Sequence, residues 1–333
     1  MSRILAVVLC IGAAACGGSK SSPTSPASAP SVLQGQTVSA VDGSAAGQVS
    51  VQVGNRSAIQ SDTDGNFQVD VGGPGTYATT VTGTGIVERN TNITGPAAGR
   101  LKVPLIPSSF DLQAFDEMFR GANSRLQRWT ARPALVVVGS VMRYSSGTSE
   151  RFDVTKERMT EEEVAALIEH LNEGLALLTA GTYTSFSSVQ IEWPAAGEFV
   201  NVQRTGSIVV GRYSGIRNLA QTIGYGTWAE QTDGTVVGGA MWLDRDFDRD
   251  DAGRRLLRIH ELGHALGLNH VTVRPSIMNP SLGPSPTDFD RGAAAIAFQR
   301  PVGNTSPDRD PGTAGTRLFA TDGGPARWNT PIQ

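Results

Sequence analysis

The chain has 333 residues, with 28 Lys and Arg against 31 Asp and Glu, a formal net charge of −3 and a pI near 5.9. Nucleic-acid binding usually requires a strong excess of basic residues, which is absent here, so no nucleic-acid partner is expected. The two cysteines, Cys10 and Cys16, are too few for a disulfide framework.

The N-terminus has the pattern of an export signal. Met1–Arg3 is a short cationic start, and Ile4–Ala15 is an apolar run that is too short to span a bilayer but suits a signal peptide. The step from Ala15 to Cys16 resembles a bacterial lipoprotein processing site. This resemblance implies removal of residues 1–15 and a lipid on Cys16, which would hold the protein at the bacterial cell envelope, facing the periplasm or the cell surface. The alternative is an ordinary secretory signal cut near Ala15.

A linker and a region of β-type composition follow the signal. Residues 16–31 are rich in Ser, Pro and Ala and predict a disordered linker. Residues 32–107 predict a small all-β sandwich with short alternating strands separated by turns. The strands are expected at Gln36–Ala40, Val49–Val53, Asn66–Val71, Tyr77–Thr82 and Leu101–Leu105.

Part of this sandwich resembles a known module. Thr63–Phe67, with the sequence Thr-Asp-Gly-Asn-Phe, and Gly75–Tyr77 are similar to the carboxypeptidase-regulatory-like, transthyretin-type β-sandwich. The resemblance implies a spacer or a binding module without chemistry of its own. Acids in these turns are expected to be turn residues and not metal ligands.

Residues 108–300 mix helices and strands. Phe110–Trp129 predicts an amphipathic helix, and the capping box at Thr160–Glu163 opens a second helix that runs to Leu178. Strands are expected at Ala134–Tyr144, Val189–Trp193, Ser207–Tyr213 and Thr235–Leu243. Residues 301–333 are rich in Gly, Pro and Asp and are expected to form a C-terminal tail.

An acidic segment, Asp244–Asp251, has aspartates at alternate positions, as in a calcium loop. An EF-hand needs glycine at the sixth position and glutamate at the twelfth, but Arg249 and Arg255 stand there. Calcium therefore stays only an alternative. The simpler interpretation is that Asp250 or Asp251 caps the next helix while the other acids are solvated.

The motif His-Glu-x-x-His-x-x-Gly-x-x-His occupies residues 260–270 and indicates a metal site. Residues four apart lie on one helix face, so His260 and His264 can both face one ion. Gly267 can take the positive φ that ends the helix, and the turn returns His270 as third ligand. Three protein ligands and an open fourth position are typical of a catalytic zinc ion. The other histidine, His170, lacks this spacing and is expected to be structural.

Glu261 stands beside the first histidine and is placed to act as a general base. A zinc ion lowers the pKa of its water to about 7, and Glu261 could take the proton and pass it to a leaving amine. Zinc is therefore the expected cofactor, and hydrolysis is the expected reaction.

Ser276–Pro280, with the sequence Ser-Ile-Met-Asn-Pro, follows the zinc motif. Together the two motifs resemble the metzincin clan of zinc endopeptidases, and within it the matrixin-like branch. The resemblance implies that Met278 is the structural methionine of the turn beneath the metal. Pro280 replaces the tyrosine that some branches use as a ligand. Val271 departs from the serine usual in matrixins and leaves the subfamily open.

The metzincin resemblance also implies a fold. An α+β domain with a twisted mixed sheet and an active-site helix would follow the sandwich in a multidomain chain. Strand 235–243 would be the edge strand that pairs with substrate, with Gly238, Gly239 and Ala240 as candidate contacts. Residues 271–285 would form the wall of the specificity pocket, and a helix would run from about Ser285 to Phe298. A propeptide cysteine often keeps matrixins latent, and the processed chain would have none.

These patterns predict a membrane-anchored, extracytoplasmic zinc endopeptidase whose partners are a protein or peptide substrate and, through its lipid, the membrane. Two alternatives remain open. The protein could hydrolyse a non-peptide amide, or it could be a surface adhesion protein whose zinc domain is inactive.

Overall fold

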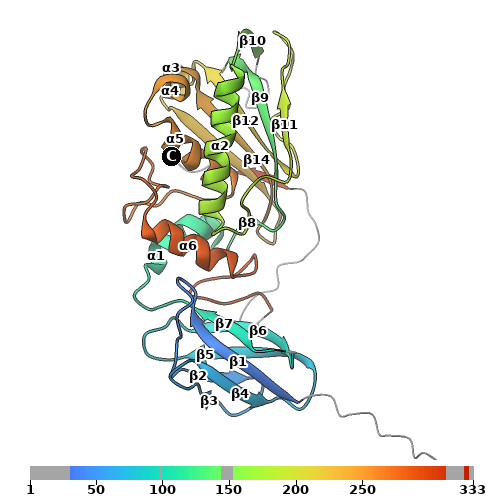
Figure 1. Cartoon of the computed structure of the whole chain (residues 1–333), viewed down its shortest axis with the longest axis vertical. Coiled ribbons are helices and arrows are strands. Elements are labelled where there is room, and N and C mark those ends of the chain that lie inside the picture. Colours follow the sequence, from blue (N-terminus) through green and yellow to red (C-terminus); the bar gives the residue numbers. More distant parts are fainter. Residues whose placement is uncertain (1–30, 98, 144–152, 313–325, 330–333) are drawn as a thin grey trace, which may run out of the picture.

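The computed structural model describes residues 31–97, 99–143, 153–312 and 326–329. The predicted signal peptide and Cys16 lie outside these residues. Among the described helices, none has the length and apolar character needed to cross a membrane. Figure 1 shows two parts stacked along the long axis, with the strands β1–β7 at one end and the larger sheet with its helices at the other.

The N-terminal part consists of two sheets, ordered β4-β1-β7 and β3-β2-β5-β6. Side chains alternate between buried and exposed along β1 and β4, and the buried ones from both sheets form one hydrophobic cluster. The bounds are β1 Val32–Ser39, β2 Ser50–Val53, β3 Ile59–Gln60, β4 Asn66–Asp70, β5 Gly75–Thr82, β6 Arg89–Gly95 and β7 Leu101–Leu105.

Strand β6 is absent from the sequence prediction, and its packing explains why. Arg89 and Thr91 are polar, yet both are buried, because they face ionic partners in the second part of the chain and not an apolar core. Alternation of apolar residues therefore does not reveal this strand.

The second part is built on a mixed sheet in the order β10-β9-β12-β14-β13-β15, with β11 added to β9 and β8 added to β14. Strands β9, β12 and β14 are parallel, and β13 runs antiparallel to β14. The bounds are β8 Arg128–Trp129, β9 Ala134–Arg143, β10 Asp153–Arg158, β11 Val189–Glu192, β12 Ser207–Ser214, β13 Gly224–Glu230, β14 Thr235–Asp244 and β15 Arg327–Asn329.

The helices of this part are α1 Leu112–Phe115, the π-helical turn η1 Asp116–Arg120, the 3-10 turn η2 Gly121–Asn123, α2 Glu161–Leu178, α3 Ile216–Ala220, α4 Arg245–Asp250, α5 Arg254–Ala265 and α6 Asp288–Phe298. The capping box of Thr160 and Glu163 opens α2, and a second box of Thr287 and Asp290 opens α6. The helix predicted over Phe110–Trp129 is wrong in its second half. Gly121 has a φ of +46°, the chain turns there, and Trp129 joins the sheet in β8.

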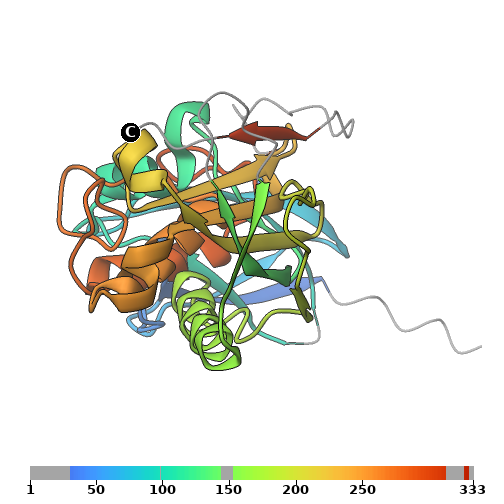
Figure 2. The ribbon, with the colours of Figure 1, turned by 90° about the horizontal axis from the view of Figure 1, so that it is seen from above.

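The prediction that strand 235–243 forms the substrate edge is wrong. This strand is β14, and it pairs with β12 on one side and β13 on the other, so Gly238, Gly239 and Ala240 have no free edge to offer. The outer strand is β13, whose other side pairs, among the described strands, only with the short β15. In Figure 2, β15 (red) lies at one border of the molecule, opposite α2 (light green) in that view.

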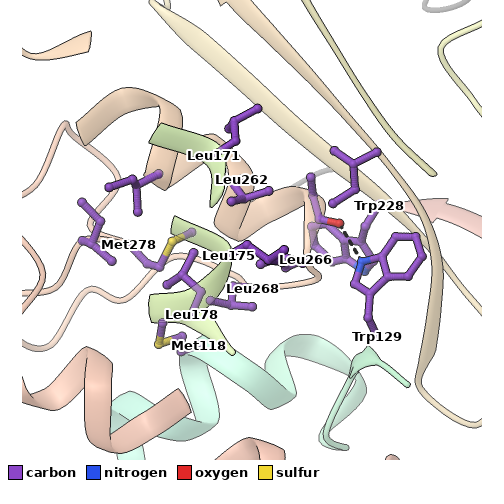
Figure 3. Packing of buried hydrophobic residues seen from close by; sticks show 14 of the residues in the cluster. Met118, Trp129, Leu171, Leu175, Leu178, Trp228, Leu262, Leu266, Leu268 and Met278 are labelled. Atoms are coloured by element: carbon purple, nitrogen blue, oxygen red, sulfur yellow. Dashed lines mark hydrogen bonds between the residues drawn. The ribbon is translucent and has the colours of Figure 1, made fainter. Parts of the chain in front are cut away.

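Helix α5 packs between the sheet and α2. Figure 3 shows Leu171, Leu175 and Leu178 of α2 lying near Leu262 and Leu266 of the α5 region. Trp129 donates from Nε1 to the carbonyl of Ala265 across 3.1 Å and ties the C-terminal end of α5 to β8. All of these leucines are buried, so α5 is held on a rigid base.

The two parts of the chain meet at a buried group of charges. The interface ion cluster consists of Arg89 from β6 and Arg300, Asp308 and Asp310 from the segment after α6. Arg89 contacts Asp308 at 2.7 Å and Asp310 at 2.6 Å, and Arg300 contacts Asp308 at 2.8 Å. Burial of charges is costly unless they are paired, and these pairs connect the two parts in a defined position.

Candidate metal centre

The three histidines of the motif converge on one point. His260 and His264 lie one turn apart on α5, and His270 returns from the loop that follows. The Nε2 atom of His264 lies 3.1 Å from Nε2 of His260 and 3.1 Å from Nε2 of His270. Within the described part of the chain, these histidines form the cluster that could hold a metal ion.

The other ring nitrogens fix how these side chains are protonated. Nδ1 of His260 lies 2.7 Å from the carbonyl oxygen of Ile277, and Nδ1 of His264 lies 2.8 Å from that of Leu268. A carbonyl can only accept, so each Nδ1 carries the proton and donates. The Nε2 lone pairs therefore face one another, which is unfavourable unless a cation lies between them. This arrangement fits zinc, because backbone carbonyls commonly orient histidine ligands in this way.

Burial reinforces the neutral state of these rings. Burial is the largest cause that lowers the pKa of His260, to about 4, and its proximity to His270 adds to the effect. Burial also lowers the pKa of His264 well below its usual value. Neutral imidazole is the form that binds a metal, so the protein holds these side chains ready for it.

Glu261 lies on the same helix with its carboxylate buried beside the histidines. Burial raises its pKa to about 8, since a charged carboxylate loses its hydration there. A Cβ atom at Gly224 would lie 2.4 Å from Oε1 of Glu261. The carboxylate thus lies directly against the β13 backbone, next to the metal ligands.

Glycines of β13 allow this close approach. A Cβ at Gly226 would lie 2.5 Å from Cβ of His264 and 2.6 Å from the carbonyl oxygen of Glu261. Any side chain at Gly224 or Gly226 would push the strand away from α5. Residue patterns alone did not indicate these glycines, because β13 is not among the strands predicted from the sequence. The turn Gln231–Gly234, with its Asp-Gly step between two strand-like segments, is the hairpin signal that could have revealed the strand.

Helix α5 ends at the point where the chain must turn to bring His270 back to His260 and His264. Gly267 has a φ of +96°, and the N–H of Leu268 donates to the carbonyl of Gly263. The turn carries the chain to His270, and the following Val271 is fully buried with its N–H bonded to the Met278 carbonyl at 2.8 Å. Burial in the core accounts for an apolar residue at position 271.

Met278 lies beneath the helix. Its side chain is fully buried, and a Cβ at Gly263 would lie 2.4 Å from its sulfur atom. Asp290, at the start of α6, accepts hydrogen bonds from the Ser276 hydroxyl and from the Ile277 N–H, which positions this turn. The Ile277 carbonyl is the one that orients His260. Residues 276–290 thus support the ligands from below.

The acidic segment has a structural role that differs from the prediction. Asp248 is fully buried and pairs with Arg212 and Arg258, both at 2.6 Å, so it is not solvated. Asp244 caps α4, and the N-cap of α5 is Gly253 without a side-chain hydrogen bond. The N-cap position is thus Gly253 and not Asp250 or Asp251, although the Asp251 carboxylate accepts from the Gly253 N–H at 2.7 Å just before the helix. Because Asp248 is neutralised by two guanidinium groups, it is not free to bind calcium.

Two cavities meet at the histidines. The metal-site cavity, of about 230 Å³, is lined by Gly224, Tyr225, Gly226, His260, Glu261 and His264. The side cavity, of about 860 Å³, is lined by Leu112, Asp116, Glu117, Ala122, Asn269 and Thr272. Both also include His270 and Pro280, so one opens beside the other. No residue of β1–β7 lines either of them.

Together, a mixed sheet, a helix carrying two histidines, a third histidine after a glycine turn and a methionine beneath them define a metallopeptidase-type site. A comparison with protein families agrees, because the model of the Matrixin family matches residues 218–291. The chain therefore contains a matrixin-like, metzincin-type domain, which at the level of the family indicates a zinc metallopeptidase. A search of curated proteins finds no match.

Proposed function

We propose that the chain is a zinc endopeptidase that binds peptide along β13 and uses Glu261 as its general base. The observation that carries this proposal is the convergence of three histidine ring nitrogens beside a buried carboxylate, directly under an open strand edge. Zinc bound by His260, His264 and His270 would supply Lewis acidity toward a water molecule and the scissile carbonyl.

Residues of the chain would transfer the proton, exclude bulk water and orient the histidines. The carboxylate form of Glu261, which a cation held by the histidines would favour over the protonated form, accepts the proton of the attacking water and delivers it to the nitrogen of the leaving amine. Its burial removes competing bulk water, which strengthens electrostatic interactions at the reacting bond. The carbonyls of Ile277 and Leu268 hold His260 and His264 in the ligand tautomer throughout.

The substrate is placed by strand addition to β13. Over Gly224–Gly226 this strand pairs with β14 on its inner side, and its outer side pairs with no other described strand. A peptide added antiparallel there would lie directly above Glu261. Its main chain would be held by backbone hydrogen bonds, and cavities on either side would select its side chains.

The experiment is the Glu261→Gln variant, assayed for cleavage of a denatured protein and analysed for bound zinc. We expect zinc content near that of the wild type and loss of cleavage by at least about 10²-fold, which is the scale of general-base catalysis. Glu173→Gln is the matched control, because Glu173 is a half-exposed glutamate on α2 that pairs with Arg255. Wild-type turnover by Glu261→Gln would refute the mechanism.

We further propose that the processed protein is anchored at the cell envelope through lipid on Cys16, with residues 16–31 as a tether. The support is the apolar run Ile4–Ala15 followed by Ala-Cys-Gly. Metabolic labelling with a radioactive fatty acid should label the wild type and not Cys16→Ala. Equal labelling of both proteins would refute the anchor.

A further inference from the structure

The side cavity shares His270 and Pro280 with the metal-site cavity, and most of its wall comes from outside residues 218–291. Leu112, Asp116, Glu117 and Ala122 belong to α1, η1 and η2, while Asn269 and Thr272 come from the loop that carries His270. The cavity is therefore a feature of this chain that the family match does not describe.

The position of the side cavity relative to β13 follows from the contacts of η2. Asn123, next to the lining residue Ala122, donates to Oε1 of Glu230 at 2.7 Å, so η2 lies beside the C-terminal end of β13. The metal-site cavity instead borders Gly224–Gly226 at the start of that strand. A peptide antiparallel to β13 has its N-terminal residues toward Glu230. The side cavity thus lies on the N-terminal side of the scissile bond.

Strand β15 limits how far a peptide can follow β13. It pairs antiparallel with Trp228, Ala229 and Glu230, and the Thr227 hydroxyl donates to the Asn329 carbonyl at 2.7 Å. The edge next to Gly224–Gly226 is open, but the edge beyond Thr227 is already used. The N-terminal part of a bound peptide must therefore leave the strand edge there, where the side cavity opens.

The charged side chains that line the side cavity are acidic. Two carboxylates, Asp116 and Glu117, line it, and no Lys or Arg is among its lining residues. Glu117 accepts from the Thr272 N–H at 2.7 Å and from its hydroxyl at 3.0 Å, and no described ion pair involves it. Arg120, which pairs with Asp116, is 1% exposed and also donates to Asn304 away from the cavity. Because Arg120 offsets the charge of Asp116, Glu117 is the carboxylate that makes this wall of the cavity acidic, within partly apolar surroundings.

We propose that the side cavity binds a cationic group on the N-terminal side of the scissile bond, either a Lys or Arg side chain or the ammonium of the substrate N-terminus. This inference rests on the proposed peptidase function and adds the substrate class. Leu112 and Ala122 would contact the aliphatic stem, and Asp116 and Glu117 would meet the charge.

The test uses zinc-loaded full-length protein and paired peptides cut at one site. On the N-terminal side of that site, each pair differs by Arg against citrulline, by Lys against norleucine, or by a free against an acetylated N-terminus. We expect kcat/KM for at least one cationic member to be about tenfold above its neutral partner. The pair that shows the difference identifies the source of the cation.

Variants assign the preference to the side cavity. Glu117→Gln keeps a carbonyl oxygen for the Thr272 N–H and should bring the ratio of cationic to neutral kcat/KM down toward one, as should Asp116→Asn. Asp250→Asn removes one carboxylate that lines neither cavity and should leave the ratio unchanged. Dissociation constants of the same peptides with Glu261→Gln and Glu261→Gln/Glu117→Gln should show the same discrimination without turnover.

The outcomes separate the two proposals. Cleavage with no preference for a cation in any pair, or a preference that survives in both Glu117→Gln and Asp116→Asn, would overturn the side-cavity proposal and leave the peptidase intact. Absence of all cleavage by the zinc-loaded wild type would overturn the proposed function itself.

Discussion

At the residue scale, the site depends on which atoms of the histidines are already engaged. The Nδ1 atoms of His260 and His264 are fixed by carbonyls, and the Nε2 atoms are left facing one another at 3.1 Å. A cation between these atoms would be bound by both lone pairs, which only the folded chain brings together. Metal binding and folding stability are therefore coupled at this point.

Metal removal tests that coupling. We expect a chelator to lower the melting temperature and zinc to restore it, because a ligand at about 100 times its Kd stabilises the folded state by about 2.7 kcal/mol. For a chain of this size that corresponds to a shift of several degrees. His264→Ala, which removes the central ligand, should show no zinc-dependent shift, whereas His170→Ala should respond like the wild type. A shift of equal size in His264→Ala would contradict the assigned ligands.

Gly226 tests how closely β13 must approach the helix. Because a Cβ there would meet the Glu261 carbonyl oxygen at 2.6 Å, and backbone cannot rotate away, Gly226→Ala should lower the free energy of unfolding by about 1–3 kcal/mol and reduce peptide cleavage. Gly99→Ala is the control, since nothing lies within 4 Å of a Cβ there. Denaturant unfolding measures the stability of both variants. A Gly226→Ala variant as stable as the wild type would count against the close approach of β13 to the helix.

At the element scale, the sequence predicted the helices better than the strand order. The capping box at Thr160–Glu163 and the run to Leu178 define α2 locally, and the structure confirms both ends. By contrast, β14 reads as a strand in the sequence, but only its hydrogen-bonded neighbours show that it is interior to the sheet. Strand pairing is a long-range property, which residue patterns do not report.

Strand β15 should act as a removable cover of the β13 edge. Deleting residues 313–333 removes the pairing with Trp228–Glu230 and the contact of Trp328 with the hydrophobic cluster around Tyr225 and Trp242. We expect a lower melting temperature together with faster cleavage of peptides extended on their N-terminal side, because the exposed edge can accept more residues. Identical rates on short and long peptides before and after deletion would contradict this role.

At the scale of the whole molecule, the interface ion cluster decides how the two parts of the chain are joined. Asp308 is fully buried between Arg89 and Arg300, and Asp310 pairs with Arg89 as well. The N-terminal sheets are thereby fixed at the end of the molecule that does not line either cavity. This position of the N-terminal sheets agrees better with a role as a spacer than with a role in covering the metal site.

Asp308→Asn tests the junction. Removing the charge leaves Arg89 and Arg300 buried with less compensation, so we expect a loss of about 3 kcal/mol in the free energy of unfolding. Asp288→Asn, at a solvent-exposed acid on α6, should change stability by less than about 0.5 kcal/mol. Unfolding by denaturant measures both, and equal stabilities would show that the cluster contributes little to the junction.

The pH dependence of this junction has a definite sign. Burial opposes ionisation of Asp308, but Arg300 and Arg89 outweigh it and hold the pKa of this carboxyl below its usual value. A carboxyl whose pKa is lower when folded adds stability above its unfolded pKa, about 3.9, and loses it as pH falls through the folded pKa. The difference in stability between wild type and Asp308→Asn should therefore persist at pH 5 and shrink only below about pH 4. A difference that vanishes between pH 7 and 5 would contradict this assignment.

The sequence by itself indicated the candidate metal ligands, the proposed general base and the turn beneath them, because these depend on spacing within one helix and its immediate continuation. His260 and His264 face the same way on any regular helix, and Gly267 permits the turn that follows. Only the tertiary structure decided which strand lies at the edge of the sheet, where the side cavity lies and how the N-terminal sheets attach. Those features are made by residues distant in the sequence, such as Asn123 with Glu230 and Arg89 with Asp308. Their contacts arise from the packing of whole elements, which no local pattern encodes.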